Sequence, residues 1–222
     1  MITSIFYKEW IKTRRILLLS LVVFAALITY IFINVEQMFR INGATQVWTE
    51  TILKDISVLT RIQWLPLILS VLFGVSQFVP EMSNKRLKLT LHLPMPENKI
   101  MFSMLAFGLS GLLILYAITY MAILGGLNIY YPPEIVWSMV EASLPWFLAG
   151  LAGYLFVAWI CIEPVWRHRV FNTLIAAYAL TFFMISAKSG AYMPFIPYLL
   201  AIIIVAHFFS FYSMYRFKDG SQ

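Results

Sequence analysis

The feature that most constrains this chain is the length of its uncharged stretches. Residues 16–35 form the first of them, a run of 20 residues without any Asp, Glu, Lys or Arg. As a helix, this run covers about 30 Å, which matches the hydrocarbon core of a bilayer. Soluble domains carry about 25% charged residues, whereas this chain has 12% and is 61% hydrophobic. Because so few polar residues cannot cover a globule, the chain is predicted to be a polytopic membrane protein.

Charged residues and proline-rich breaks divide the rest of the chain into further apolar stretches, each long enough for a transmembrane helix. The predicted spans are residues 16–35, 62–80, 100–127, 135–162, 170–187 and 194–215. The segments between these spans are too short to hold a soluble catalytic domain. We therefore predict a single all-α transmembrane domain over residues 1–222, with six transmembrane helices.

The basic residues are distributed unevenly between the two sides of this predicted topology. With six spans both termini share a side, and that side receives most of the 16 Lys and Arg residues. It holds Lys8, Lys12, Arg14, Arg15, Lys85, Arg86, Lys88, Lys99, Arg167, Arg169, Arg216 and Lys218. The other side holds Arg40, Lys54, Arg61 and Lys188. By the positive-inside rule both termini are expected in the cytoplasm, in a plasma membrane such as the inner membrane of a bacterium. The net charge of +6 thus reflects orientation, and no nucleic acid partner is expected.

Residues 1–15 have the pattern of an amphipathic helix. Apolar side chains recur at helical spacing, and basic side chains line the opposite side (Ile2, Ile5, Phe6 and Trp10 against Lys8, Lys12 and Arg15). Such a helix lies in the membrane interface, with its bases toward anionic lipid headgroups. Positive charge flanking a first span can also serve only to orient that span. We predict an interfacial helix over residues 1–15.

The loop of residues 81–99 is longer than the connection of two spans requires. Its leucines alternate with polar residues over 87–93, a spacing that suits a strand, but a lone strand has no neighbour to pair with. Pro94 ends a helix at the preceding residue, so a short helix fits this segment better. An exposed segment rich in leucine and basic residues needs a partner that buries its leucines. The two candidate partners are the bilayer surface and another protein.

Two phrases of the sequence are similar to the signatures of one transporter family. The first is Phe6-Tyr7-Lys8-Glu9-Trp10, continued by Lys12 and Arg14-Arg15. The second consists of Glu81, Lys85-Arg86, Leu89-Thr90-Leu91 and Leu93-Pro94. With the order of the predicted parts, these phrases resemble the permease subunit of type-2 family ABC exporters. The chain departs from that family at Lys88-Leu89, where a glycine is common.

The resemblance implies a cytoplasmic coupling helix between spans two and three that inserts into a separate ATPase subunit. The docking residues it implies are Glu81, Lys85, Arg86, Leu89, Thr90, Leu91, Leu93 and Pro94. Two permeases, either copies of this chain or related chains, would form the translocation path. The chain lacks a P-loop sequence. It is therefore expected not to be an enzyme and to hold no cofactor, with ATP and Mg²⁺ bound by the partner ATPase.

Two ionisable residues fall inside the predicted spans, where such groups are costly and suggest function. Glu141 is either part of a substrate path or an acid at the membrane interface. His207 lies near the middle of the last span, where it is either a ligand or proton carrier or an interhelical hydrogen-bond donor. The three histidines fall in separate places, so no metal site is expected.

Three classes of function remain in competition. The aromatic-rich, charge-poor spans favour an apolar or amphipathic cargo, as a permease of the resembling family would carry. The alternative is an ion-coupled secondary transporter or channel, which would favour broken helices and several ionisable groups near the midplane. A membrane enzyme would need paired acids or a His cluster, and the spans contain neither.

Overall fold

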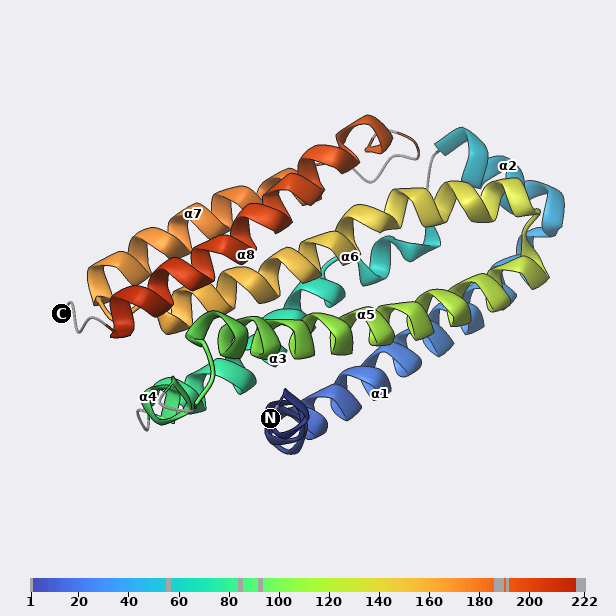
Figure 1. Ribbon diagram of the computed structural model, residues 1–222. Helices are drawn as coiled ribbons and strands as arrows, with labels where there is room; N and C mark the ends of the chain where they lie inside the picture. Colours follow the sequence, from blue (N-terminus) through green and yellow to red (C-terminus); the bar gives the residue numbers. More distant parts are fainter. Residues whose placement is uncertain are drawn as a thin grey trace.

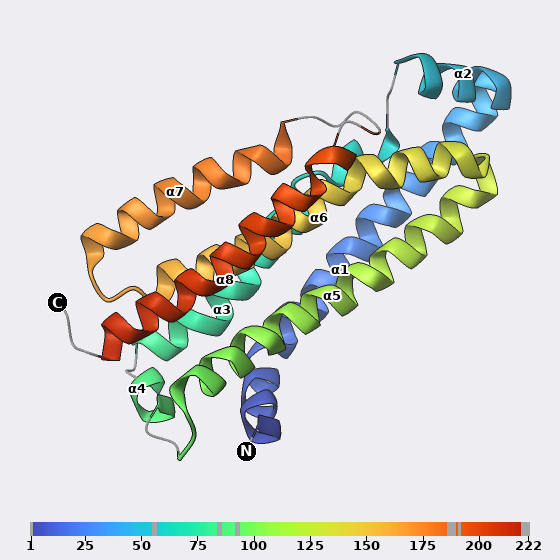
Figure 2. The same ribbon diagram turned by 45° about the horizontal axis from the view of Figure 1, so that its top comes forward.

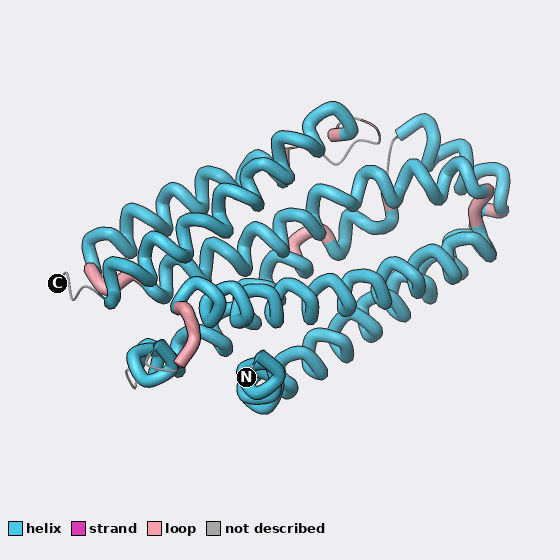
Figure 3. Tube along the Cα trace, in the orientation of Figure 1, coloured by secondary structure: helices cyan, strands magenta, loops and turns pink. Residues whose placement is uncertain are grey.

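The computed structural model describes residues 2–54, 57–83, 86–91, 94–185, 190 and 192–218. Within these ranges the chain is helical, with short connections and no strand (Figure 3). The elements are α1 (Ile2–Asn42), α2 (Ala44–Lys54), η1 (Val58–Ile62), α3 (Leu65–Ser83), α4 (Arg86–Leu91), α5 (Glu97–Tyr130), α6 (Pro133–Ile162), α7 (Trp166–Met184), η2 (Met193–Phe195) and α8 (Ile196–Lys218).

The long helices run side by side in one elongated bundle (Figures 1 and 2). Five helical stretches are long and apolar enough to cross a membrane: α1, η1 with α3, α5, α6, and η2 with α8. The prediction of an all-α polytopic membrane protein is therefore confirmed. The α7 helix packs against α6 but is not among the five, because the basic residues of its first turn lower its mean hydropathy. A sixth span remains a prediction.

The first helix is longer than one membrane crossing requires. Its 41 residues cover about 62 Å, roughly twice the thickness of the hydrocarbon core. The expected interfacial helix over residues 1–15 is therefore not a separate element, since its hydrogen bonding continues into the span. Its first turns nevertheless run in a different direction from the rest of α1 (Figures 1 and 2).

The segment 36–60, expected to be a loop, contains helix instead. Helix α1 continues to Asn42, and Gly43 reverses the chain with a φ of 76°, a conformation that glycine adopts without steric cost. Helix α2 follows, and the Trp48 indole donates a hydrogen bond to the backbone oxygen of Tyr130 at 3.1 Å. This bond fixes α2 against the end of α5.

Helix α6 lies at the centre of the core and packs against α3, α7 and α8. Its Tyr154 hydroxyl donates to Oε1 of Gln77 at 2.9 Å, and Nε2 of Gln77 donates to the backbone oxygen of Met104 at 2.9 Å. These bonds satisfy buried polar groups and join α3, α5 and α6. A Cβ at Gly108 would overlap the Tyr154 hydroxyl, so this glycine is what admits the tyrosine between the helices.

Candidate functional site

The start of α1, the end of α8 and helix α4 lie at the same end of the bundle, which we call the terminal end (Figures 1 and 2). Helix α4 connects α3 and α5 in sequence and contacts both of them. Residues 86–91 form a helix and not a strand, whereas its role as a coupling helix stays a prediction. Because α4 has fewer than two turns, its orientation depends on contacts with its neighbours and not on its own helical stability.

Helix α4 has one side against the bundle and one side exposed. Leu87 is 1% exposed and Thr90 is buried, so these two residues attach the helix to its neighbours. Leu89 is 71% exposed, and Arg86 and Lys88 are exposed beside it. We call Arg86, Lys88 and Leu89 the outer face of α4. This face places one large apolar side chain between two cations.

An ion-pair cluster holds the inner side of α4 to the first helix. Lys8 Nζ donates to Oε2 of Glu81 at 3.0 Å and to Oγ1 of Thr90 at 3.0 Å. Lys12 Nζ donates to Oε1 of Glu81 at 2.9 Å and lies 2.8 Å from Oε2 of Glu9. We call Lys8, Glu9, Lys12, Glu81 and Thr90 the terminal cluster. It ties α1, the last turn of α3, and α4 together.

The two acids of the terminal cluster are both buried, with Glu9 0% and Glu81 1% exposed. They lie outside the predicted spans 16–35 and 62–80. Burial raises the pKa of Glu9, and the nearby Lys12 offsets this only in part. Burial acts in the same direction on Glu81, but the hydrogen bonds and charges of Lys12 and Lys8 outweigh it and lower the pKa of that carboxyl. Glu81 is therefore the charged centre of the cluster.

The residues predicted to bind an ATPase fall into three groups. Glu81 and Thr90 are buried and paired inside the chain, so they position α4 and are not exposed to a partner. Arg86, Leu89 and Pro94 are exposed. Lys85, Leu93 and the side chain of Leu91 lie outside the described residues. Lys88, which is not among the docking residues predicted from the sequence, is exposed as well.

The C-terminal end of α8 lies next to the outer face of α4. Lys88 Nζ is 5.7 Å from the centroid of the Phe217 ring, within the range of a cation–π contact. Lys218 Nζ is 2.7 Å from Oε1 of Glu97 at the start of α5. The surface around α4 thus receives side chains from both ends of the sequence.

A third buried carboxylate at the terminal end, that of Glu163, was not predicted from the sequence. Glu163 follows α6 and is 1% exposed. The Ser213 hydroxyl donates to its Oε2 at 2.6 Å, Arg216 Nη1 lies 3.1 Å from its Oε1, and Arg169 Nε donates to its backbone oxygen at 2.6 Å. These contacts join the adjacent ends of α6, α7 and α8. The available signal was an acid at the end of a predicted span, on the side that receives most of the basic residues, Arg169 and Arg216 among them.

The two ionisable residues proposed for a substrate path do not meet. Glu141 is half-buried on α6, and none of the described residues forms an ion pair with it. His207 is half-buried on α8, where its ring centroid lies 5.9 Å from that of Phe102 and 5.2 Å from that of Phe211. Among the described residues, no group of three or more His, Cys, Asp or Glu side chains could hold a metal ion. The surroundings of His207 are aromatic.

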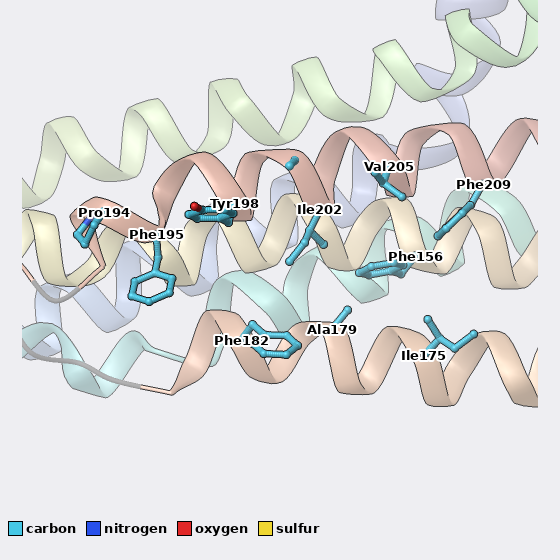
Figure 4. A pocket seen from close by; sticks show the side chains of 11 residues that line it. Phe156, Ile175, Ala179, Phe182, Pro194, Phe195, Tyr198, Ile202, Val205 and Phe209 are labelled. Atoms are coloured by element: carbon cyan, nitrogen blue, oxygen red, sulfur yellow. The ribbon is translucent and has the colours of Figure 1, made fainter.

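An apolar groove of about 870 Å³ separates α7 from α8, with α6 at its back (Figure 4). Ile175 and Phe182 of α7 face Tyr198 and Phe209 of α8, and Phe156 of α6 completes the wall. The Tyr198 hydroxyl is the one polar side-chain group among the lining residues. A groove of this size and composition can take an apolar molecule.

None of the family models, curated proteins or solved structures compared with the chain matches it.

Proposed function

We propose that the chain is the membrane-spanning permease subunit of an ABC transporter, forming the translocation path for an apolar or amphipathic cargo. In this proposal α7 is the sixth span, both termini are cytoplasmic, and the protein resides in a plasma membrane. A second copy or a related permease completes the path. Separate ATPase subunits bind ATP and Mg²⁺ and supply the energy.

The observation that carries this proposal is the outer face of α4. Leu89 is 71% exposed on a helix held by Leu87 and the terminal cluster. An exposed apolar side chain on a fixed support, bordered by charges, is suited to docking into a protein cleft. Arg86 and Lys88 would lie at the rim of such a contact, where charges speed association more than they strengthen binding.

The attachment of α4 also suits the transmission of a mechanical force. Helix α4 is joined to α3 and α5 by the chain and to α1 by the bond between Lys8 and Thr90. A partner that moves α4 therefore moves the ends of three long helices together. A segment that merely rests on lipid would not need a buried ion-pair network beneath it, because removing charges from water is costly.

The apolar groove between α7 and α8 supports an apolar or amphipathic cargo. Its walls offer aromatic and aliphatic side chains and one hydroxyl. The alternative of an ion-coupled transporter or channel has less support, since Glu141 and His207 are not brought together and the described residues hold no metal-binding group. Ion coupling usually needs several ionisable groups at one site in the membrane.

The test is chemical cross-linking in native membranes, followed by identification of the proteins bound to the chain. We expect a P-loop ATPase with the wild-type chain and its loss with Leu89→Asp. Leu53→Asp is the matched control, because Leu53 is 78% exposed on α2 at the opposite end of the bundle. The proposal is wrong if no P-loop ATPase is captured with the wild-type chain, or if Leu89→Asp retains the full amount.

A further inference from the structure

A smaller groove of about 310 Å³ lies at the terminal end, between the start of α1, the start of α5 and the end of α8. We call it the Lys99 groove. Its lining residues are Ile2, Asn98, Lys99, Phe102, Ser103 and Phe211. The groove therefore combines one cationic side chain with two aromatic rings. It is separate from the larger apolar groove, with which it shares no lining residue.

Lys99 has no counter-charge among the side chains that the structure describes. Among the lysines whose side chains the structure describes, Lys8 and Lys12 bind Glu81, Lys88 contacts a phenylalanine ring, and Lys218 binds Glu97. Lys99 is exposed and makes no such contact with any described residue. The nearest acid in sequence, Glu97, forms an ion pair with Lys218. Within the described part of the chain, the ammonium group of Lys99 is therefore open to an external anion.

The aromatic part of the groove begins one turn deeper than the charge. Phe102 follows Lys99 by three residues, which places it about 4.5 Å further along the axis of α5 and on the same face. Phe102 is 56% exposed, and the His207 ring centroid lies 5.9 Å from that of Phe102 and 5.2 Å from that of Phe211. The polarity of the groove therefore changes along the helix axis, from a cation at the helix end to apolar rings further in.

We infer that the Lys99 groove binds an anionic phospholipid of the adjacent membrane leaflet. The net negative charge of the headgroup, which no cation within the lipid neutralises, lies against the Lys99 ammonium group, and an acyl chain lies along Phe102 and Phe211. A lipid fits because its own polarity changes in the same direction, from an anionic headgroup at the surface to an apolar chain below. The inference goes beyond the proposed function and requires no ATPase.

The test is native mass spectrometry of the full-length chain, purified in detergent and incubated with defined lipids. The probes are phosphatidylglycerol and phosphatidylcholine with identical acyl chains. We expect about fivefold tighter binding of phosphatidylglycerol, the factor typical of one lysine near an anionic membrane surface. Lys99→Gln should remove this preference, and Lys99→Arg should keep it. The matched control is Arg15→Gln, which removes an exposed charge at the same end of the bundle but outside the groove.

A second set of measurements separates the contribution of the lipid headgroup from that of the acyl chain. We expect Phe102→Ala to weaken binding of both lipids, and soluble glycerol phosphate to compete poorly. The inference is overturned if the wild-type protein shows no preference for phosphatidylglycerol, or if Lys99→Gln retains that preference. It is also overturned if soluble glycerol phosphate displaces the bound lipid as effectively as phosphatidylglycerol does. Because purified chain and lipid are the only components, this result is independent of whether an ATPase docks on α4.

Discussion

Lys12 Nζ lies 2.9 Å from Oε1 of Glu81, and this contact joins two helices whose paired residues are 69 positions apart in the chain. The same ammonium group lies 2.8 Å from Oε2 of Glu9. One cation therefore serves two buried acids, and a second cation, Lys8, extends the network to α4. The outer face of α4 owes its position to this arrangement.

The first prediction concerns the stability of the terminal cluster. Lys12→Met should lower the free energy of unfolding by about 3 kcal/mol, because Glu81 keeps Lys8 but the buried Glu9 loses the cation that contacts it. Arg40→Met is the control, since it breaks the exposed pair of Arg40 with Glu36, and exposed pairs contribute about 0–1 kcal/mol. The measurement is the thermal unfolding of both variants in detergent. Equal midpoint temperatures of unfolding for Lys12→Met and Arg40→Met would contradict the structural role of the terminal cluster.

The second prediction separates the rim of the docking face from its centre. Arg86→Gln should slow association of the ATPase at low ionic strength and have little effect at high ionic strength, where exposed charges are screened. Leu89→Ala should instead speed dissociation at both ionic strengths, because it removes apolar contact area. Binding kinetics at two salt concentrations measure both effects. A salt-independent effect of Arg86→Gln would show that this cation is not a rim charge.

The third prediction tests close packing between α3, α5 and α6. A methyl group at Gly150 would overlap the Tyr116 hydroxyl and lie 2.9 Å from the backbone oxygen of Pro66. Gly150→Ala should therefore destabilise the chain by about 1–3 kcal/mol, as overpacking does. Gly125→Ala is the matched control on α5, where a Cβ meets no atom within 4 Å. That control should be neutral or slightly stabilising, because alanine favours a helix more than glycine. Thermal unfolding in detergent compares the two variants.

The fourth prediction is that α7 crosses the membrane. In a Cys161→Ser background, Arg167→Cys should react with a membrane-impermeant maleimide only after the cells are permeabilised, while Lys54→Cys and Lys188→Cys should react in intact cells. The expectation follows from the uneven distribution of basic residues. Lys188 lies outside the described residues, so its labelling is an independent test. Labelling of both Arg167→Cys and Lys188→Cys from the same side would show that α7 does not cross the membrane.

The sequence alone determined the membrane class and most of the helices. Hydropathy depends on composition over a window of residues, so a run such as 16–35 needs no tertiary information to be recognised. The short helix before Pro94 was predictable for a similar reason, since proline restricts the backbone of its own neighbours. The continuation of α1 through residue 15 and the presence of α2 were missed. Charged residues near 15 and 36 suggested helix ends, although charges do not interrupt helical hydrogen bonds.

Only the tertiary structure decided which side chains of these helices are available to a partner. Glu81 and Leu89 belong to the same sequence phrase, yet Glu81 is buried against Lys8 and Lys12 whereas Leu89 is 71% exposed. The difference arises because Lys8 and Lys12 reach Glu81 across the bundle, and no local pattern in residues 81–99 encodes that contact. The same holds for Glu163 with Ser213 and for the groove around Lys99. Helix packing sets these pairings over separations of dozens of residues, whereas sequence patterns report on neighbours within a few turns.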